Sequence, residues 1–152
     1  MENVIITEMN LAARLFQCGI MKYLDQDELT LYMTDLCYHS KAHDYNRDKD
    51  FVNEMVNVGQ IKIIELNSSQ VERASKLLQR YYPKFVLKTV SSMVSATDLD
   101  FILLSEDALL RETVSKDFGV VAQDKTWLTE RIINSLSNKE NGFNPSMLRL
   151  II

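Results

Sequence analysis

The stretch Val4-Ile5-Ile6-Thr7-Glu8-Met9-Asn10-Leu11 sets the fold class at the start of the chain. Its first four residues form a short β-branched run, which is typical of a strand buried on both faces. A helical pattern over Leu11–Phe16 follows directly and ends near Gly19, a residue type that is common just after a helix. A buried strand that leads straight into a helix predicts a sheet covered by helices.

The same alternation of strand and helix continues along the chain. Four more short apolar or β-branched runs predict strands, at Leu29–Met33, Ile61–Leu66, Phe101–Leu104 and Val120–Ala122. Helical patterns are found at Leu11–Phe16, Ile20–Leu24, Leu36–Ala42, Phe51–Val58, Gln70–Tyr82, Lys84–Thr97, Asp107–Asp117 and Thr126–Leu136. Strands joined by helical crossovers pair in parallel. We therefore expect an α/β fold, a single three-layer domain whose mainly parallel sheet of about five strands is flanked by helices.

Composition supports one domain followed by a tail. The chain has 152 residues, of which 46% are hydrophobic and 25% charged, the balance of an ordinary globular domain. Ser137–Pro145 (SNKENGFNP) has linker composition and leads to the apolar run Met147–Ile152. We assign residues 1–136 to the domain and residues 137–152 to a linker and C-terminal tail. We expect the tail to pack on its own domain; the alternative is that it contacts a protein partner or the second copy of a homodimer.

The sequence also indicates a compartment and limits the classes of ligand. It has no signal-peptide pattern and no apolar run of about 20 residues, so we expect a cytoplasmic protein with no membrane attachment. Cys18 and Cys37 are the only cysteines and form no CxxC, so we expect buried, reduced thiols. Neither glycine-rich phosphate-loop signature occurs among only four glycines, so no organic cofactor is expected. The net charge of −4 argues mildly against tight, non-specific binding of nucleic acid, without excluding a basic face.

Acidic and polar residues follow the predicted strands directly. In order along the chain they are Glu8, Asn10, Thr34, Asp35, Ser105, Glu106, Asp107, Gln123 and Asp124. Ligands of open parallel sheets bind beyond the carboxyl ends of the strands, and carboxylates gathered there are suitable ligands for Mg²⁺ or Mn²⁺. The alternative is that each residue caps the helix that follows it. We favour capping for any single residue and a shared site for the pair Glu8 and Asp107.

Three segments occur in the order and spacing of one family's motifs. Glu8-Met9-Asn10-Leu11 resembles an opening D-x-[NS], and Leu103-Leu104-Ser105-Glu106-Asp107 with Leu109-Leu110-Arg111 resembles L-L-T-x-D-x-x-L-R. Phe118-Gly119-Val120-Val121 resembles the glycine and last strand that follow in that family. The family is the PIN domain, a metal-dependent ribonuclease fold, and the resemblance covers residues 4–134.

This resemblance implies a site of three or four carboxylates that hold Mg²⁺ or Mn²⁺ and activate water for phosphodiester hydrolysis. Carried over by position, the first acid falls on Glu8, where aspartate is usual, and the last on Asp107. The second falls near His39 or Ser40 and the third near Thr89, so neither of these positions has a carboxylate. Missing ligands lower metal affinity and leave the metal-bound water poorly oriented. The acidic residues that could replace these ligands in space are Asp35, Glu106 and Asp124.

Asp35, His39 and His43 recur at a spacing of four residues. On a helix that reaches residue 43 they would share one face, and two histidines four residues apart can bind a transition metal. We favour the other interpretation, an exposed face with histidines near the helix end, because no third strong ligand is evident.

A series of basic residues recurs at steps of three and four: Arg73, Lys76, Arg80, Lys84 and Lys88. On continuous helices they would form a basic stripe beside Tyr81 and Tyr82, suited to the phosphates and bases of single-stranded RNA. The competing interpretation, which we favour, is a solvated charged face with tyrosines packed inward. Pro83 falls within the series and is expected to break the helix.

Two functions follow from these observations. We favour a PIN-like module with an eroded metal site that binds nucleic acid or protein without catalysis. The alternative is a Mg²⁺- or Mn²⁺-dependent ribonuclease of the toxin–antitoxin type, with Glu8 and Asp107 as catalytic, metal-holding residues.

Overall fold

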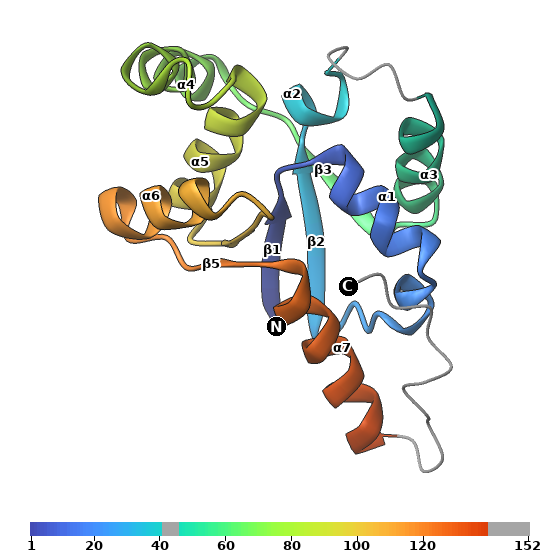
Figure 1. The fold of residues 1–152 in the computed structure, drawn as a ribbon. Helices are drawn as coiled ribbons and strands as arrows, with labels where there is room; N and C mark the ends of the chain where they lie inside the picture. The colour runs from blue at the N-terminus through green and yellow to red at the C-terminus, as the bar shows by residue number, and fades with distance from the viewer. Residues whose placement is uncertain (41–45, 140–152) are drawn as a thin grey trace.

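The computed structural model describes residues 1–40 and 46–139 (Figure 1). Its centre is a sheet of five parallel strands in the order β3-β2-β1-β4-β5. The strands are β1 (Glu2–Ile6), β2 (Leu29–Thr34), β3 (Ile61–Ile64), β4 (Ile102–Leu104) and β5 (Ala122–Gln123). The predicted parallel α/β sheet is therefore confirmed.

Helices connect the strands and cover both faces of the sheet. They are α1 (Met9–Gln17), the short 3₁₀ helix η1 (Ile20–Tyr23), α2 (Asp35–Tyr38), α3 (Asn46–Asn57), α4 (Ser68–Tyr81), α5 (Leu87–Leu99), α6 (Ala108–Phe118) and α7 (Lys125–Lys139). Figure 1 shows α1 and α3 together on one side of the sheet and α4, α5 and α6 on the other. The fold is the three-layer arrangement that the strand–helix alternation predicted.

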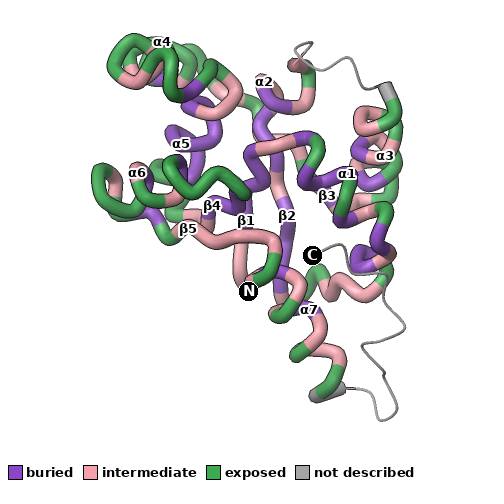
Figure 2. The backbone as a smooth tube through the Cα atoms, in the orientation of Figure 1, coloured by how far each residue is buried: buried purple, intermediate pink, exposed green. Residues whose placement is uncertain are grey.

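Two hydrophobic clusters hold the layers together. Val4 and Ile6 of β1 point into the cluster formed with α1, α3 and α7, whereas Ile5 points into the cluster formed with α4, α5 and α6. All three side chains are fully buried, and Figure 2 shows the central strands buried along most of their length. Side chains alternate between the faces of a strand, so a continuous apolar run is needed where both faces are covered.

The main differences from the predicted helix boundaries lie in four helices. The helix predicted over Leu36–Ala42 ends at Tyr38, where His39 is the C-cap residue. Helix α3 begins at Asn46, within the segment predicted as a loop, and α7 continues to Lys139, three residues beyond the helix end predicted at Leu136. Helix α5 begins at Leu87 instead of Lys84, because the backbone turns between Tyr81 and Lys84 before it becomes helical again.

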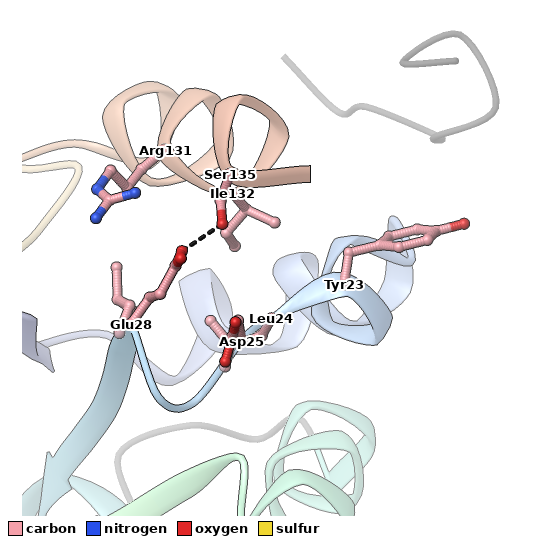
Figure 3. Close-up of a pocket in the computed structure, with 8 residues that line it drawn as sticks. Tyr23, Leu24, Asp25, Glu28, Arg131, Ile132 and Ser135 are labelled. Carbon is pink, nitrogen blue, oxygen red and sulfur yellow. Dashed lines mark hydrogen bonds between the residues drawn. The ribbon is translucent and has the colours of Figure 1, made fainter. Parts of the chain in front are cut away.

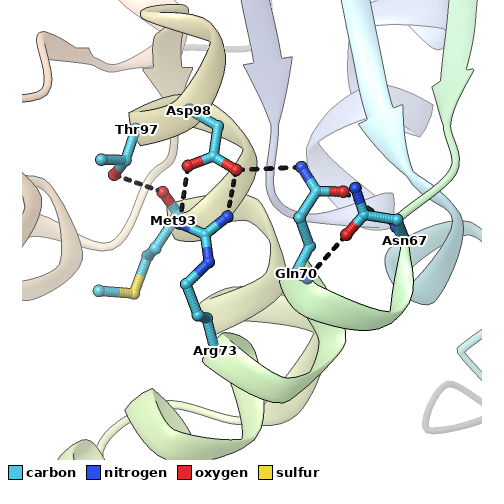
Figure 4. A network of polar contacts seen from close by, with 6 residues as sticks. All are labelled: Asn67, Gln70, Arg73, Met93, Thr97 and Asp98. Carbon is cyan, nitrogen blue, oxygen red and sulfur yellow. Dashed lines mark hydrogen bonds and ion pairs between the residues drawn. The ribbon is translucent and has the colours of Figure 1, made fainter.

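A polar network joins α4 to α5 (Figure 4). Asn67 and Gln70 form a capping box at the start of α4, in which each side chain bonds the other's backbone N–H. The Gln70 side chain also donates to Asp98 at the end of α5. The guanidinium of Arg73 forms a bidentate ion pair with the same carboxylate. This network aligns the two helices over one face of the sheet.

Both cysteines are buried and free, as predicted. No helix among residues 1–40 and 46–139 has the length and apolar character needed to cross a membrane. The segment 140–152, including the predicted apolar tail, and residues 41–45, including His43, lie outside the described residues.

Candidate site at the carboxyl ends of the central strands

The chain changes direction across the sheet at β1. From β1 the connections run outward to β2 and β3, and the chain then returns to place β4 and β5 on the other side of β1. In open α/β sheets, ligands bind in the crevice beyond the carboxyl ends of the strands at such a switch point. The candidate site is therefore the segment after β1, which contains Glu8, and the segment after β4, which contains Ser105 to Asp107.

The carboxylate of Glu8 bridges these two segments. Its Oε1 accepts a hydrogen bond of 2.6 Å from the hydroxyl of Ser105 and one of 3.2 Å from the backbone N–H of Glu106. The hydroxyl of the neighbouring Thr7 donates to its Oε2. Thr7 and Ser105 are almost fully buried, whereas Glu8 is half-buried. Both oxygens of this carboxylate are thus engaged by donors of the protein itself.

Asp107 is linked to Glu8 through Ser105, but its side chain has a separate role. The Ser105 hydroxyl accepts a 3.0 Å hydrogen bond from the backbone N–H of Asp107. The carboxylate of Asp107 caps α6 by accepting from the backbone N–H groups of Leu109 at 3.0 Å and Leu110 at 3.2 Å. The structure brings the predicted catalytic pair together and shows an intramolecular hydrogen-bonding role for each member.

The other acidic candidates also bond nearby backbone. Asp35 accepts from the N–H of Leu36 at 2.8 Å, in a helix that Thr34 caps. Asp124 accepts from the N–H of Trp127 at 3.0 Å in the first turn of α7. The exposed Glu106 accepts from the N–H of Lys125 at 3.2 Å, which ties the end of β4 to the start of α7. Helix capping and loop bridging account for these contacts.

The donor set therefore does not fit a carboxylate-held divalent metal. In the part of the chain that the structure describes, no three side chains of the His, Cys, Asp or Glu type are arranged to hold a metal ion. The carboxylate best placed at the switch point, that of Glu8, already bonds Ser105, Glu106 and Thr7. These donors occupy three of the roughly four acceptor positions of the carboxylate.

The β2 side of the crevice contains a lysine. Helix α5 is fixed against the end of β2 by a 3.0 Å hydrogen bond between the hydroxyls of Thr34 and Ser91. One turn before Ser91 lies Lys88, close enough to the buried Cys37 to affect that thiol electrostatically. Burial raises the pKa of Cys37 to about 11, the charge of Lys88 opposes this rise, and Glu8 adds to it. A positive charge thus lies near the position where the resemblance implies an acid.

The sequence placed Lys88 in the basic stripe and did not predict this position. Lys88 and Ser91 are three residues apart, so the helical spacing in the sequence already places both on one face of α5. The packing of that face against β2 depends on tertiary structure.

The remaining predicted positions are peripheral. Asn10 is exposed, and its side chain accepts from the N–H of Leu11 at 3.0 Å. His39 is exposed at the end of α2 with its ring edge-on to Tyr38, 4.9 Å between centroids. Ser40 and Thr89 are half-buried. Helix α2, on which Asp35, His39 and His43 could have shared a face, ends at Tyr38 with His39 as its C-cap residue, and His43 lies outside the described residues.

The five basic residues do not lie on one continuous helix. Arg73 pairs with Asp98, Lys76 lies 3.6 Å from Glu72, and Arg80 lies over the ring of Tyr81 at 5.1 Å from its centroid. Lys84 lies in the exposed turn between α4 and α5, and Lys88 is on α5. Tyr81 packs inward and donates to Asp117 at 2.7 Å, whereas Tyr82 is 70% exposed.

Comparison with solved structures identifies the architecture. The structure of VapBC-1 from nontypeable Haemophilus influenzae matches with a TM-score of 0.54 and 11% identity, over 83% of this chain and 99% of that one. VapBC2 from Rickettsia felis, bound to a DNA fragment from its promoter, matches with a TM-score of 0.50 and 9% identity, over 80% of this chain and 98% of that one. No protein-family model matches the sequence, and no curated protein has significant sequence similarity to it. At these identities the likeness shows the fold alone, which is PIN-like, as the motifs predicted.

Proposed function

We propose that this PIN-like domain is a binding module for single-stranded nucleic acid that has no nuclease activity. The observation that carries the proposal is the state of Glu8, whose two carboxylate oxygens accept hydrogen bonds from Ser105, Glu106 and Thr7. A metal-activating carboxylate needs oxygen lone pairs directed at the ion. Here they hold the ends of β1 and β4 together, so the residue stabilises the fold.

The loss of acids elsewhere supports the same conclusion. The α5 face beside β2 carries Lys88 and Ser91 in place of a carboxylate, and α2 ends with the exposed His39. A lysine near the crevice repels a divalent cation and attracts phosphate. This substitution favours contact with a nucleic-acid backbone without metal-dependent hydrolysis.

The surface around the α4–α5 turn provides a stacking platform. Tyr82 is 70% exposed, and the exposed cations Arg80 and Lys84 flank it two residues away on either side. An exposed aromatic ring between cations binds single-stranded nucleic acid by base stacking and phosphate contact. Lys88 adds a further positive charge at the start of α5.

A ribonuclease of the toxin–antitoxin type is the second candidate. Its support is the meeting of Glu8 and Asp107 at Ser105 on a PIN-like fold, with Mg²⁺ or Mn²⁺ as the implied cofactor. The VapBC structures also suggest a protein partner for such a chain.

Two measurements separate these functions. Calorimetric titration of Mg²⁺ and Mn²⁺ into the metal-free protein should give no binding heat above dilution for the wild type or for the Glu8→Gln, Asp107→Asn variant. Binding tighter than about 1 mM, or roughly −4 kcal/mol, in the wild type alone would instead favour the ribonuclease.

Binding of a fluorescent single-stranded RNA in EDTA tests the nucleic-acid function. Tyr82→Ala should weaken binding by about 1–3 kcal/mol through the lost stack, and Lys84→Glu should weaken it most at low salt. Lys116→Glu, an equal charge change on the exposed end of α6, is the matched control. Equal binding by all three variants would exclude this surface.

A further inference from the structure

Apolar side chains are exposed together at the turn between α4 and α5. Beside the exposed Tyr82, Val86 is 49% exposed and Leu87 is 37% exposed, so all three fall within residues 82–87. The other large apolar side chains that are exposed in the described part of the chain occur singly along the sequence. Single exposed apolar residues are normal, whereas a group of them is a feature of binding surfaces. The turn therefore has the apolar character of a ligand contact.

Two inward-packed aromatic side chains hold this turn in place. The rings of Tyr81 and Phe85 lie 5.6 Å apart, centroid to centroid, and Phe85 is almost fully buried. The Tyr81 hydroxyl donates to Asp117 of α6 at 2.7 Å, and its backbone carbonyl accepts from the N–H of Lys84 at 2.8 Å. The turn is thus fixed to α6 while its apolar side chains stay exposed. A surface that is fixed before binding loses less conformational entropy when a ligand binds.

Exposed cations lie next to these apolar side chains. Arg80 and Lys84 are each two residues from Tyr82, and both are exposed. Neither forms an ion pair with another described residue. Their charge attracts an anion, although the chain as a whole carries a net charge of −4 and repels one. The ligand that matches this turn therefore combines negative charge with flat apolar surface.

The pocket in Figure 3 is a contrasting case. It lies between α7 and the turn before β2, and two of its polar side chains bond to carboxylates of the protein itself. The hydroxyl of Ser135 donates to Glu28, and Nε of Arg131 donates to Glu2 at 2.6 Å. Arg131 is therefore already paired with a carboxylate, in contrast to the two exposed cations of the α4–α5 turn, for which the described chain supplies no such partner.

The apolar surface of the turn has an aromatic part and an aliphatic part. Four residues of extended backbone span at most about 14 Å, and the turn brings Tyr82 and Val86 closer than that. The ring of Tyr82 is suited to stacking on the face of a base, and the side chains of Val86 and Leu87 are suited to apolar contact with another. Every base has such a face, so contacts of this kind depend on stacking area more than on hydrogen-bonding groups. A purine offers Tyr82 more area than a pyrimidine does.

We infer that the α4–α5 turn binds two consecutive unpaired bases of a single strand, with a purine preferred on Tyr82 and its neighbour on Val86 and Leu87. Arg80 and Lys84 contact the adjoining phosphates. The inference rests on the proposed nucleic-acid function and adds the part of the ligand that the turn recognises. A base within a duplex is stacked and paired, so it reaches Tyr82 only after it leaves the stack, and the turn favours single strands.

Fluorescence anisotropy with labelled oligouridines of about eight nucleotides, in EDTA, tests the purine preference. The wild type should bind a strand with one central adenine about threefold more tightly than the strand without it, because adenine stacks over a larger area. Tyr82→Ala should weaken binding of both strands and remove this preference. Equal affinity of the wild type for both strands would overturn the assignment of a purine to Tyr82 without affecting the proposed function.

Two substitutions test the contact with the second base. Val86→Ser with Leu87→Ser should weaken binding of the adenine-containing strand by about threefold to tenfold, because apolar contact area is lost. Val86 is the N-cap residue of α5, where serine is favoured, so the fold should not be weakened. Val58, just after α3 on the other side of the sheet, is 63% exposed, and Val58→Ser is the matched control.

A strand that lacks the bases on both sides of the adenine completes the test. The wild type and the double variant should bind this abasic strand equally, because contact with Val86 and Leu87 needs a second base. A double variant that binds the intact strand as tightly as the wild type, or that loses equally on the abasic strand, would overturn the inference and not the proposed function. Absence of binding to every strand would overturn both and would favour a protein partner for the apolar turn.

Discussion

The hydroxyl of Ser105 donates a 2.6 Å hydrogen bond to the carboxylate of Glu8, across the junction between β1 and β4. The same hydroxyl accepts from the backbone N–H of Asp107, so one buried serine satisfies groups on both sides of the crevice. These residues are the ones that a PIN-domain nuclease would need for metal. In this chain their hydrogen bonds link the segment after β1 to the segment after β4.

Removal of that hydroxyl should destabilise the fold. Ser105→Ala leaves an oxygen of Glu8 without its shortest hydrogen bond and the N–H of Asp107 without an acceptor, at an expected cost of about 1–3 kcal/mol. Urea unfolding gives the difference in the free energy of unfolding. Ser115→Ala, at an exposed position of α6, is the control and should change little. Equal stability of the two variants would mean that the hydrogen bonds of the Ser105 hydroxyl contribute nothing to the free energy of unfolding.

Asp107 should behave as a helix cap. Asp107→Ala removes the acceptor for the N–H groups of Leu109 and Leu110 and should cost about 0.5–2 kcal/mol, whereas Asp107→Ser should recover most of that loss. Thermal unfolding with and without millimolar Mg²⁺ checks the role. A metal ligand would make the loss depend on Mg²⁺ and would not be replaced by serine.

The pairing of Arg73 with Asp98 should appear in the pH dependence of stability. The hydrogen bonds from Arg73 hold the pKa of the Asp98 carboxyl below its ordinary value of 3.8. A lowered pKa in the folded state adds stability that is present above pH 3.8 and is lost as the pH falls through the folded-state pKa. The contribution is small because both side chains are substantially exposed.

Unfolding of the wild type and Asp98→Asn across acid pH measures this contribution. The stability difference should be largest above pH 3.8 and shrink below it. Glu130→Gln, at an exposed carboxylate of α7, controls for the change in net charge. A difference that grows on acidification would contradict the assigned sign.

Both thiols should resist modification in the folded protein. Cys37 is 1% exposed and has a pKa of about 11, so only about one thiol in a thousand is ionised at pH 8. Cys18 is 7% exposed. A thiol reagent should titrate neither cysteine rapidly in buffer and both in urea. Rapid reaction of one equivalent without denaturant would show that one of these side chains is accessible.

The parts of the structure that depend on local pattern could be predicted from the sequence. Val4–Ile6 is β-branched and apolar because both faces of β1 are covered, and that signal is local. The end of α2 was missed because Thr34 provides a cap signal for a helix start, while nothing nearby marks a stop at Tyr38. The position of Lys88 beside Cys37 depends on the packing of α5 against β2, which a single sequence does not display.

The residue types at the candidate site could be predicted from the sequence, but the hydrogen bonds between them could not. The residues after β1 and β4 were expected to meet because the carboxyl ends of parallel strands share one edge. Which groups would satisfy the Glu8 carboxylate depended on distances across that edge. Ser105, which bonds this carboxylate, was predicted to follow a strand at that edge, but its hydrogen bond to Glu8 was not predicted.

The place of β1 at the centre of the sheet has a consequence for synthesis. Val4 pairs in register with Ile102, and most of the described chain lies between the two strands. β1 leaves the ribosome before β4 and remains without this partner until β4 is made. A nascent or truncated chain that stops before Ile102 has a buried-type strand with one open edge, and such an edge recruits strands from other chains. This risk of aggregation is therefore concentrated in incomplete chains, because β4 closes the open edge of β1.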